Sequence, residues 1–131
     1  RELLRRGELS VAGRTVRVEE VSTPRPGQSF ALVMDTRPCP GAGQLARRVD
    51  LLVCEATYLT SEAREAHEHL HMTAGQAAEL ARSAGVRRLV LTHFSQRYLT
   101  LDPFLAEAAA IHGDVVVAQD LTRVAVPRRL E

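Results

Sequence analysis

The stretch Leu51-Leu52-Val53-Cys54-Glu55 (residues 51–55) indicates the fold class of this chain, because a short apolar run ends directly in an acidic residue. A continuous apolar run of this length is typical of a strand that is covered on both faces of a sheet. Similar apolar runs occupy residues 30–34, 88–92 and 115–118. The sequence therefore predicts four short buried strands.

Helical patterns lie between these runs. The clearest covers residues 73–83, where Thr73 fits an N-cap, alanines form an apolar face and Gly85 fits the end of the helix. Other helices are predicted near residues 44–48, over 61–68 and over 102–111. Strands that alternate with helices predict an α/β fold. Further strands are predicted at 15–21 and 122–126, with residues 1–13 as a connecting piece.

Composition and charge exclude several classes of protein. The chain has 131 residues, 45% of them hydrophobic and 25% charged, and a net charge of +1, which is ordinary for a soluble globular domain. No stretch approaches the length of a transmembrane span, and the residues at the start do not resemble a signal peptide. All 17 basic residues are Arg, which a coding bias explains without any functional role. Two cysteines make no disulfide framework and predict a reduced, cytoplasmic protein. The first residue, Arg1, is not Met, which suggests a fragment of a longer chain.

An acid or an imidazole follows each of the four apolar runs. These residues are Asp35, Glu55, His93 and Asp120. Ligand and catalytic groups collect at the carboxyl ends of strands in α/β sheets, so the sequence predicts a functional site there. Carboxylates and imidazoles without a Cys pair indicate a metal such as zinc, or general acid–base chemistry. The absence of a Gly-rich phosphate loop and of a nucleophile elbow around Ser95 argues against a P-loop enzyme and a serine hydrolase.

The segment His67-Glu68-His69-Leu70-His71 is rich in histidine. On a helix His67 and His71 would share a face, whereas on a strand all three histidines would do so. The segment is polar and precedes a helix cap, so His67 and His69 are predicted to be solvated. His112 is predicted to be a plain residue at the C-terminal end of a helix, where the helix dipole stabilises it.

Five motifs, in their order and approximate spacing, resemble those of ribonuclease Z, a zinc-dependent family with the metallo-β-lactamase fold. The most specific are His-Met-Thr-Ala and Thr-His-Phe-Ser-x-Arg-Tyr, and the resemblance extends from about Val11 to the C-terminus. The motifs are Asp35-Thr36-Arg37-Pro38-Cys39, residues 51–58 (LLVCEATY), 71–78 (HMTAGQAA), 91–98 (LTHFSQRY) and 118–121 (AQDL).

The resemblance implies that residues 1–131 are the C-terminal half of a metallo-β-lactamase-like domain. It implies half of a four-layer αββα sandwich, with a mixed sheet and helices packed on one face. The N-terminal half, with the family's His-x-His-x-Asp-His motif, and its tRNA-clamping arm are missing from this chain. A lone half would expose an apolar sheet face, which we expect to be covered by the rest of its own chain or by a second copy.

The resemblance also implies site residues. Asp35 would bridge two zinc ions and His93 would bind one of them. His71 would stabilise the transition state or protonate the leaving oxygen, with Glu55 holding its imidazole. Substrate phosphate would be bound by Ser95 and Arg97. Asp35 and His93 alone cannot hold two zinc ions, so the other ligands lie outside this chain.

The implied reaction removes the 3′ trailer from precursor tRNA by attack of a metal-activated hydroxide, in a cytoplasmic homodimer. Two alternatives stay open: a hydrolase of small phosphate esters with the same fold, and a non-catalytic assembly module. Each site residue also has a structural interpretation. Asp35 and Asp120 are compatible with turns, Glu55 with a helix start, His93 with a buried hydrogen-bonded histidine and Arg97 with a solvated surface charge.

Overall fold

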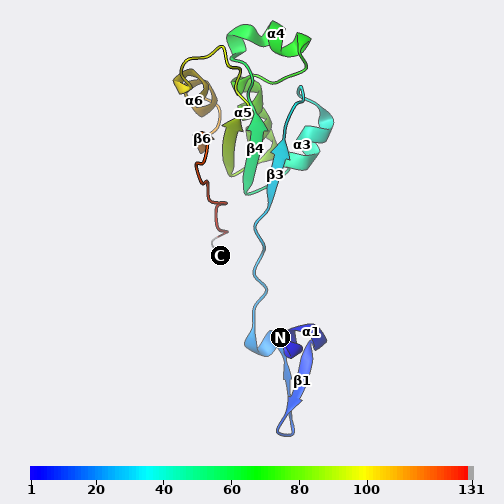
Figure 1. The fold of residues 1–131 in the computed structure, drawn as a ribbon. Helices are drawn as coiled ribbons and strands as arrows, with labels where there is room; N and C mark the ends of the chain where they lie inside the picture. Colours follow the sequence, from blue (N-terminus) through cyan, green and yellow to red (C-terminus); the bar gives the residue numbers. More distant parts are fainter. Residues whose placement is uncertain (130–131) are drawn as a thin grey trace.

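The computed structural model describes residues 1–129, and its first 21 residues form a small unit of their own (Figure 1). An antiparallel hairpin turns at Ala12 and Gly13, both in the left-handed region with φ of 50° and 78°. This pair of positive φ angles is what a tight hairpin turn requires. The predicted connecting piece 1–13 is therefore wrong, and the predicted strand 15–21 is confirmed only as far as Arg17, after which the chain is helical. The elements are α1 (Glu2–Arg6), β1 (Glu8–Val11), β2 (Arg14–Arg17) and α2 (Val18–Val21).

The main sheet has four strands in the order β3-β4-β5-β6, and all neighbouring pairs are parallel. The predicted α/β class and the four strands are confirmed, but only β4 and β5 are buried along most of their length, whereas β3 is exposed at alternate residues and β6 is half-buried. The sheet differs from the mixed sheet that we expected, because antiparallel pairing occurs only in the separate hairpin among residues 1–129. The strands are β3 (Phe30–Val33), β4 (Leu51–Glu55), β5 (Arg88–Thr92) and β6 (Val115–Val117).

The connections between these strands are helical, as predicted, but the first helix covers residues 40–46 and not 44–48. The helix over 73–83 is the best defined, because Thr73 and Gln76 form a reciprocal capping box and Gly85 ends the helix in the left-handed region. No helix in the described part of the chain is long and apolar enough to cross a membrane. The helices are α3 (Pro40–Ala46), the 3₁₀ turn η1 (Thr60–Glu62), α4 (Ala63–Glu68), α5 (Ala74–Ala84) and α6 (Asp102–Ala109).

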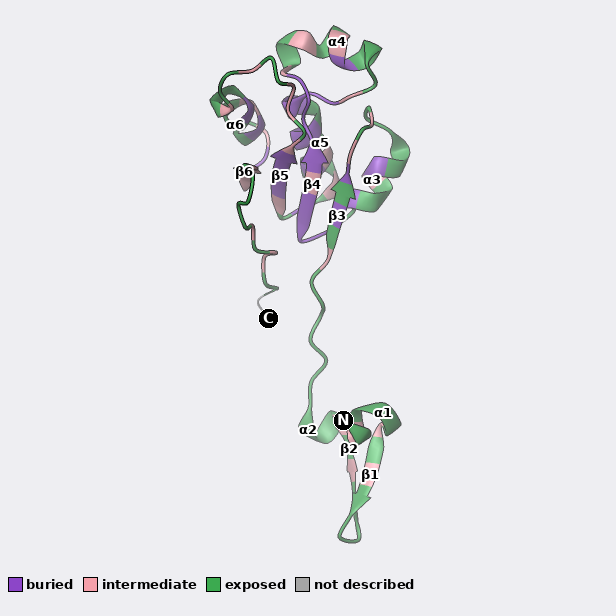
Figure 2. Ribbon diagram, viewed as in Figure 1, coloured by how far each residue is buried: buried purple, intermediate pink, exposed green. Residues whose placement is uncertain are grey.

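The hydrophobic core lies between one face of the sheet and helices α3, α5 and α6. Ala31, Leu52 and Leu89 lie opposite one another in the strand register, so their side chains share this face. They pack against the alanines of α5 and against Phe104 of α6, which is fully buried. Figure 2 shows the central strands β4 and β5 as mostly buried. The prediction that the helices cover one face of the sheet is therefore confirmed.

The opposite face of the sheet has no comparable cover within residues 1–129. Its central row is Leu32, Val53, Val90 and Val116, one residue from each strand in register. Leu32 is 54% exposed and the neighbouring Phe30 is 67% exposed, whereas Val53 and Val116 are half-buried and Val90 is buried. An exposed apolar patch of this kind is typical of a surface that another protein layer covers.

The C-terminal segment after β6 runs back toward the starts of β4 and β5. Asp50, fully buried just before β4, accepts hydrogen bonds from Arg129, from the Ser29 N–H and from Arg87. The Arg129 hydrogen bond, followed by that of Ser29, holds the pKa of Asp50 well below its ordinary value. This network connects the C-terminal segment to the end of the sheet where β4 and β5 begin.

The predicted strand 122–126 is wrong. The alternation of apolar residues there resembles a strand, but the segment has no strand pairing in the structure. Its backbone carbonyls accept side-chain hydrogen bonds instead: Gln28 donates to Val126 O at 2.7 Å and Arg88 to Ala125 O at 3.2 Å.

Candidate metal centre

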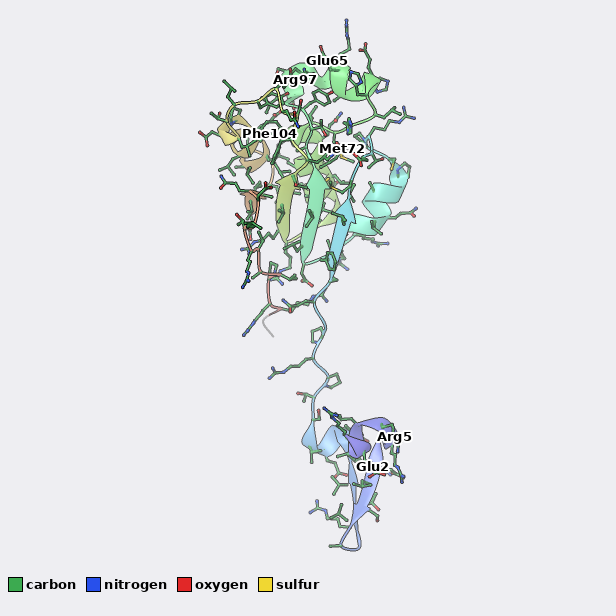
Figure 3. The ribbon with its side chains drawn as sticks, in the orientation of Figure 1. Glu2, Arg5, Glu65, Met72, Arg97 and Phe104 are labelled. Carbon is green, nitrogen blue, oxygen red and sulfur yellow. The ribbon has the colours of Figure 1, made fainter. Side chains whose placement is uncertain are left out.

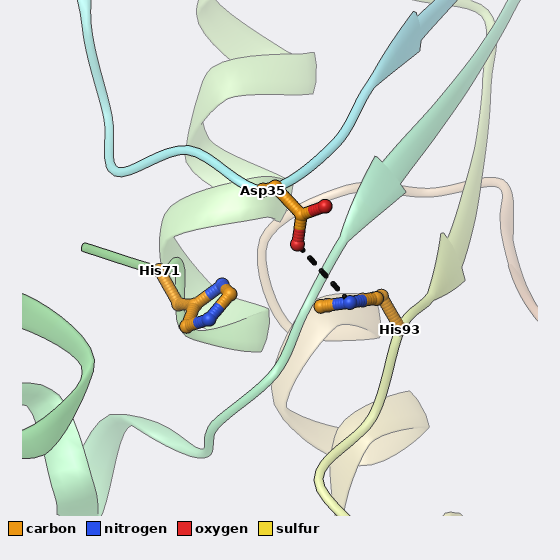
Figure 4. Close-up of side chains that lie close together, drawn as sticks. All are labelled: Asp35, His71 and His93. Atoms are coloured by element: carbon orange, nitrogen blue, oxygen red, sulfur yellow. Dashed lines mark ion pairs between the residues drawn. The ribbon is translucent and has the colours of Figure 1, made fainter. Parts of the chain in front are cut away.

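Three side chains converge at the carboxyl end of the sheet. Asp35 directly follows the Met34 that ends the β3 run, His93 follows β5, and His71 comes from the loop that precedes α5. Figure 4 shows the three side chains pointing toward one another. Asp35 and His93 have left-handed backbones, with φ of 50° and 59°. Such conformations cost on the order of 1–3 kcal/mol each in non-glycine residues and cluster at functional sites.

Glu55 accepts hydrogen bonds from several residues around the three converging side chains. Its carboxylate is fully buried at the end of β4 and lies 3.0 Å from Nδ1 of His71. A buried carboxylate is stable only when hydrogen-bond donors surround it. Here the donors come from three different segments. They are the backbone N–H of Thr36, the hydroxyl of Thr57, the backbone N–H of Met72 and the imidazole of His71.

Thr57 sets the tautomer of His93. Its hydroxyl lies 2.9 Å from Glu55 Oε2 and 3.0 Å from His93 Nδ1. A hydroxyl has a single proton to donate, and the Glu55 carboxylate can only accept it. The hydroxyl oxygen therefore accepts from Nδ1–H of His93, which leaves Nε2 of that imidazole with a free lone pair. This arrangement, in which one ring nitrogen is fixed so that the other can bind a metal, is typical of metal-ligating histidines.

The free Nε2 of His93 faces a second acceptor. It lies 3.1 Å from Oδ1 of Asp35, and both atoms have lone pairs directed at the same space. Two acceptors at this distance need a cation between them, either a proton or a metal ion. One ligand atom each of Asp35, His71 and His93 lies within 4.8 Å of the others. A carboxylate with two imidazoles is a donor set that suits zinc, so the residues present fit such an ion.

Arg97 and Ser95 lie in the loop that follows His93. Arg97 is placed over the ring of Tyr58, 5.0 Å from its centroid, and its Nη1 is 3.0 Å from Glu62 Oε1. Tyr58 in turn has its ring 6.2 Å from that of His71. Figure 3 shows Arg97 beside α4, at the same end of the fold as Met72. Ser95 is anchored by its N–H, which donates to the carbonyl of Thr57.

The structure does not bring every predicted residue to the site. Asp120 is exposed in a turn, because β6 ends at Val117 and the acid lies three residues beyond it. The metal-ligand cluster found in the described residues does not include it. His67 and His69 are exposed, as predicted. His112 follows α6 as expected but is buried, and its Nε2 has no hydrogen-bond partner among the described residues.

Sequence reasoning missed the function of Thr57, although the residue lies in one of the quoted motifs. It is buried, and its hydroxyl joins Glu55 to His93, which are 38 positions apart in the sequence. A threonine two residues after a strand-end acid is the only local signal. Its role becomes visible only when β4 and β5 are known to be neighbours.

Replacing Thr57 by valine in the complete protein is expected to weaken metal binding by about 10–100-fold, the usual loss when an outer-shell partner of a ligand is removed. Valine keeps the shape of the side chain but leaves Nδ1 of His93 without its acceptor. Competition with a chromogenic chelator measures the affinity. Thr100→Val, at an exposed position, is the matched control. An unchanged metal affinity in Thr57→Val would show that Thr57 does not fix the tautomer of His93.

Comparison with known families agrees with this geometry. The sequence profile described as "Beta-lactamase superfamily domain" matches residues 12–94, well over half of the chain. The chain therefore belongs to the beta-lactamase superfamily. The crystal structure of the metallo-β-lactamase fold protein YhfI from Bacillus subtilis aligns with a TM-score of 0.64 at 22% identity, over 70% of this chain and 37% of that one, which supports the fold alone.

Individual relatives are more specific. Ribonuclease Z of Nocardia farcinica is 62% identical over 129 residues, and that of Salinispora arenicola is 56% identical over 129 residues. Each alignment covers 98% of this chain and 42% of the relative. The short form of human tRNase Z aligns with a TM-score of 0.61 at 30% identity, over 86% of this chain and 37% of that one. The resemblance to part of ribonuclease Z is confirmed, and the chain spans about two-fifths of the length of these relatives.

Proposed function

We propose that this chain is the C-terminal half of a metallo-β-lactamase domain that, when complete, is an endoribonuclease cutting the 3′ trailer from tRNA precursors. The observation that supports a metal enzyme most strongly is a pair of acceptor atoms, His93 Nε2 and Asp35 Oδ1, which lie 3.1 Å apart. Nε2 is an acceptor because Nδ1 of the same ring donates to Thr57. The similarity to ribonuclease Z supports this particular substrate. A hydrolase of small phosphate esters and an assembly module remain the competing functions.

Asp35 and His93 would hold zinc, two ions in the complete site. A catalytic zinc takes three protein ligands and a second ion needs more, so the upstream half of the domain must supply the others. When bound, the metal would provide positive charge at the scissile phosphate and lower the pKa of water. This chain by itself therefore has an incomplete active site.

His71 and Glu55 would act on the reacting phosphate. Glu55 accepts from Nδ1–H of His71, so Nε2 of the imidazole is left free of the carboxylate, and the ring lies beside the ligand atoms of Asp35 and His93. The buried carboxylate also stabilises the imidazole when it carries two protons, which is the state that can donate a proton to a leaving oxygen. Only this pair among the site residues combines a fully buried acid with a half-buried histidine.

The uncovered face of the sheet would be the contact with the missing half. Leu32, Val53, Val90 and Val116 form a continuous apolar row on it. Packing a second sheet on this row would produce the four-layer arrangement, and it would bring further ligands to the strand ends where Asp35 and His93 lie. We further propose that the complete protein is a homodimer and that precursor tRNA is its substrate.

A cytoplasmic location is proposed from the cysteines. Cys39 is exposed and Cys54 is buried, and both are free thiols. Burial raises the pKa of Cys54 to about 12, so it remains an unreactive thiol in the core. Cys54 therefore acts as a small hydrophobic residue, which fits a reducing compartment.

The function is tested by incubating the complete protein with precursor tRNA and with bis(p-nitrophenyl) phosphate. The proposal predicts release of the 3′ trailer, its loss after treatment with a chelator, and its recovery when zinc is added. Hydrolysis of the small ester with intact tRNA would favour the phosphate-ester hydrolase. If neither substrate is cleaved, the assembly module is favoured.

Arg97→Ala is expected to raise KM for precursor tRNA several-fold and to lower the salt dependence of binding. A lost phosphate contact reduces the slope of log K against log salt concentration by roughly 0.7–0.9. Fluorescence anisotropy at several salt concentrations measures that slope. Arg64→Ala is the matched control, since Arg64 is another exposed arginine that is paired with a glutamate. Equal slopes for the two variants would show that Arg97 does not bind phosphate.

A further inference from the structure

A pocket of about 400 Å³ opens beside the metal-ligand cluster. It is lined by Arg37, Pro38, His67, His71 and Gln76, which come from the loop after β3, from α4 and from the start of α5. We propose that this pocket binds the unpaired nucleotide next to the scissile phosphate, with its base stacked on the imidazoles and its phosphate on Arg37. The inference rests on the proposed function and adds a substrate subsite to it.

The size of the pocket favours a single nucleotide. Small-molecule sites commonly occupy about 300–1,000 Å³, and a nucleotide fits at the lower end of this range. A paired RNA stem is far too wide for a pocket of about 400 Å³. Proteins recognise single-stranded RNA by splaying out one base and stacking it on planar side chains.

Planar side chains form much of the lining. The imidazoles of His67 and His71 are planar, and base stacking on planar rings is tolerant of sequence, while Pro38 adds an apolar surface. His67 is exposed and free to contact a ligand, whereas His71 is half-buried against Glu55. The pocket therefore gives His67 a function that its position in a polar, solvated stretch does not reveal.

The polar atoms of the lining are mainly donors. Arg37 is exposed, and its guanidinium has no ion-pair partner among residues 1–129. Gln76 accepts from the Thr73 N–H through Oε1, so its amide NH₂ remains available to donate. No carboxylate lines the pocket. This set of donors matches the phosphate oxygens and the acceptor atoms of a nucleobase.

The position of the pocket determines which nucleotide it would take. His71 lines the pocket and also belongs to the cluster with Asp35 and His93. A ligand in the pocket is therefore next to the place where the scissile phosphate would bind. Consecutive phosphates in an RNA strand are one nucleotide apart, so the occupant is the unit that adjoins the cut.

The test compares His67→Ala and Arg37→Ala with the control His69→Ala in the complete protein. His69 is also exposed and lies two positions from His67, but it stacks on Tyr58 and does not line the pocket. Steady-state KM and kcat are measured on precursor tRNA. We expect KM to rise about 5-fold or more in His67→Ala, because the base loses its stacking partner. A rise of about the same size is expected in Arg37→Ala, because the phosphate loses a charged hydrogen-bond donor. His69→Ala is expected to match the wild type.

Two modified RNAs, abasic on the 5′ or the 3′ side of the scissile phosphate, identify the stacked base. On one of them, the KM of His67→Ala should equal that of the wild type. The inference is overturned if His67→Ala behaves as His69→Ala, or if its defect persists on both abasic RNAs. In either case the wild type still cuts precursor tRNA. A wild type that leaves precursor tRNA uncut overturns the proposed function, and the inference with it.

Discussion

His93→Ala in the complete protein is expected to lose bound metal and RNA cleavage together. The imidazole provides a lone pair at Nε2, 3.1 Å from Asp35 Oδ1, and alanine leaves the carboxylate without that partner. Removal of an outer-shell partner already weakens a metal site by about 10–100-fold, so removal of a direct ligand should exceed that loss. Elemental analysis gives the metal content, and trailer release from precursor tRNA gives the activity.

His69→Ala is the control for this experiment, since it removes an exposed imidazole outside the cluster. Circular dichroism must show that His93→Ala is folded. If a folded His93→Ala protein keeps its full metal content, His93 is not a ligand, and the acceptor pair with Asp35 is then bridged by a proton.

His71→Ala should have the opposite profile: it keeps metal and loses turnover by about 10²–10⁴-fold, the contribution of a positioned general acid or base. Its imidazole is held by Glu55 at 3.0 Å, and one of its ring nitrogens lies within 4.8 Å of the ligand atoms of Asp35 and His93. Glu55→Gln should reduce kcat in the same direction, because an amide cannot stabilise a doubly protonated imidazole as a carboxylate does. Single-turnover rates separate this loss of chemistry from a loss of binding.

Metal content decides the role of His71. Its ligand atom lies within 4.8 Å of those of Asp35 and His93, so the same side chain is close enough to bind an ion. If His71→Ala loses metal as His93→Ala does, His71 is a ligand and not the group that acts on the phosphate. Unchanged turnover in His71→Ala would contradict both roles.

The elements that could be predicted are those with strong local signals. The capping box of Thr73 and Gln76 marks the start of α5, and Gly85 marks its end. The helix over 73–83 was therefore predictable. The buried strands were equally clear. The hairpin of residues 8–17 was not, because its two strands are short and mostly exposed, and its Ala12-Gly13 turn lacks the usual Asn-Gly or Asp-Gly signal.

Part of the site was predictable from the strand ends, and His71 was predictable only from the resemblance to a known family. Asp35, Glu55 and His93 each follow an apolar run, and the parallel register of β3, β4 and β5 brings them together. Asp120 satisfied the same rule in the sequence but lies in a turn beyond a strand that ends early. Thr57 and the pocket contact of His67 depend on segments that are distant in the sequence, so no local pattern contains them.

The most direct test of the account is the zinc content of this chain, measured beside that of the complete protein by elemental analysis after dialysis. A split active site predicts about two zinc ions per complete chain and almost none bound to residues 1–131 alone, because Asp35 and His93 are fewer ligands than even one catalytic zinc ion takes. Little zinc in both samples would contradict a metal enzyme. The fold would then belong to a non-catalytic relative.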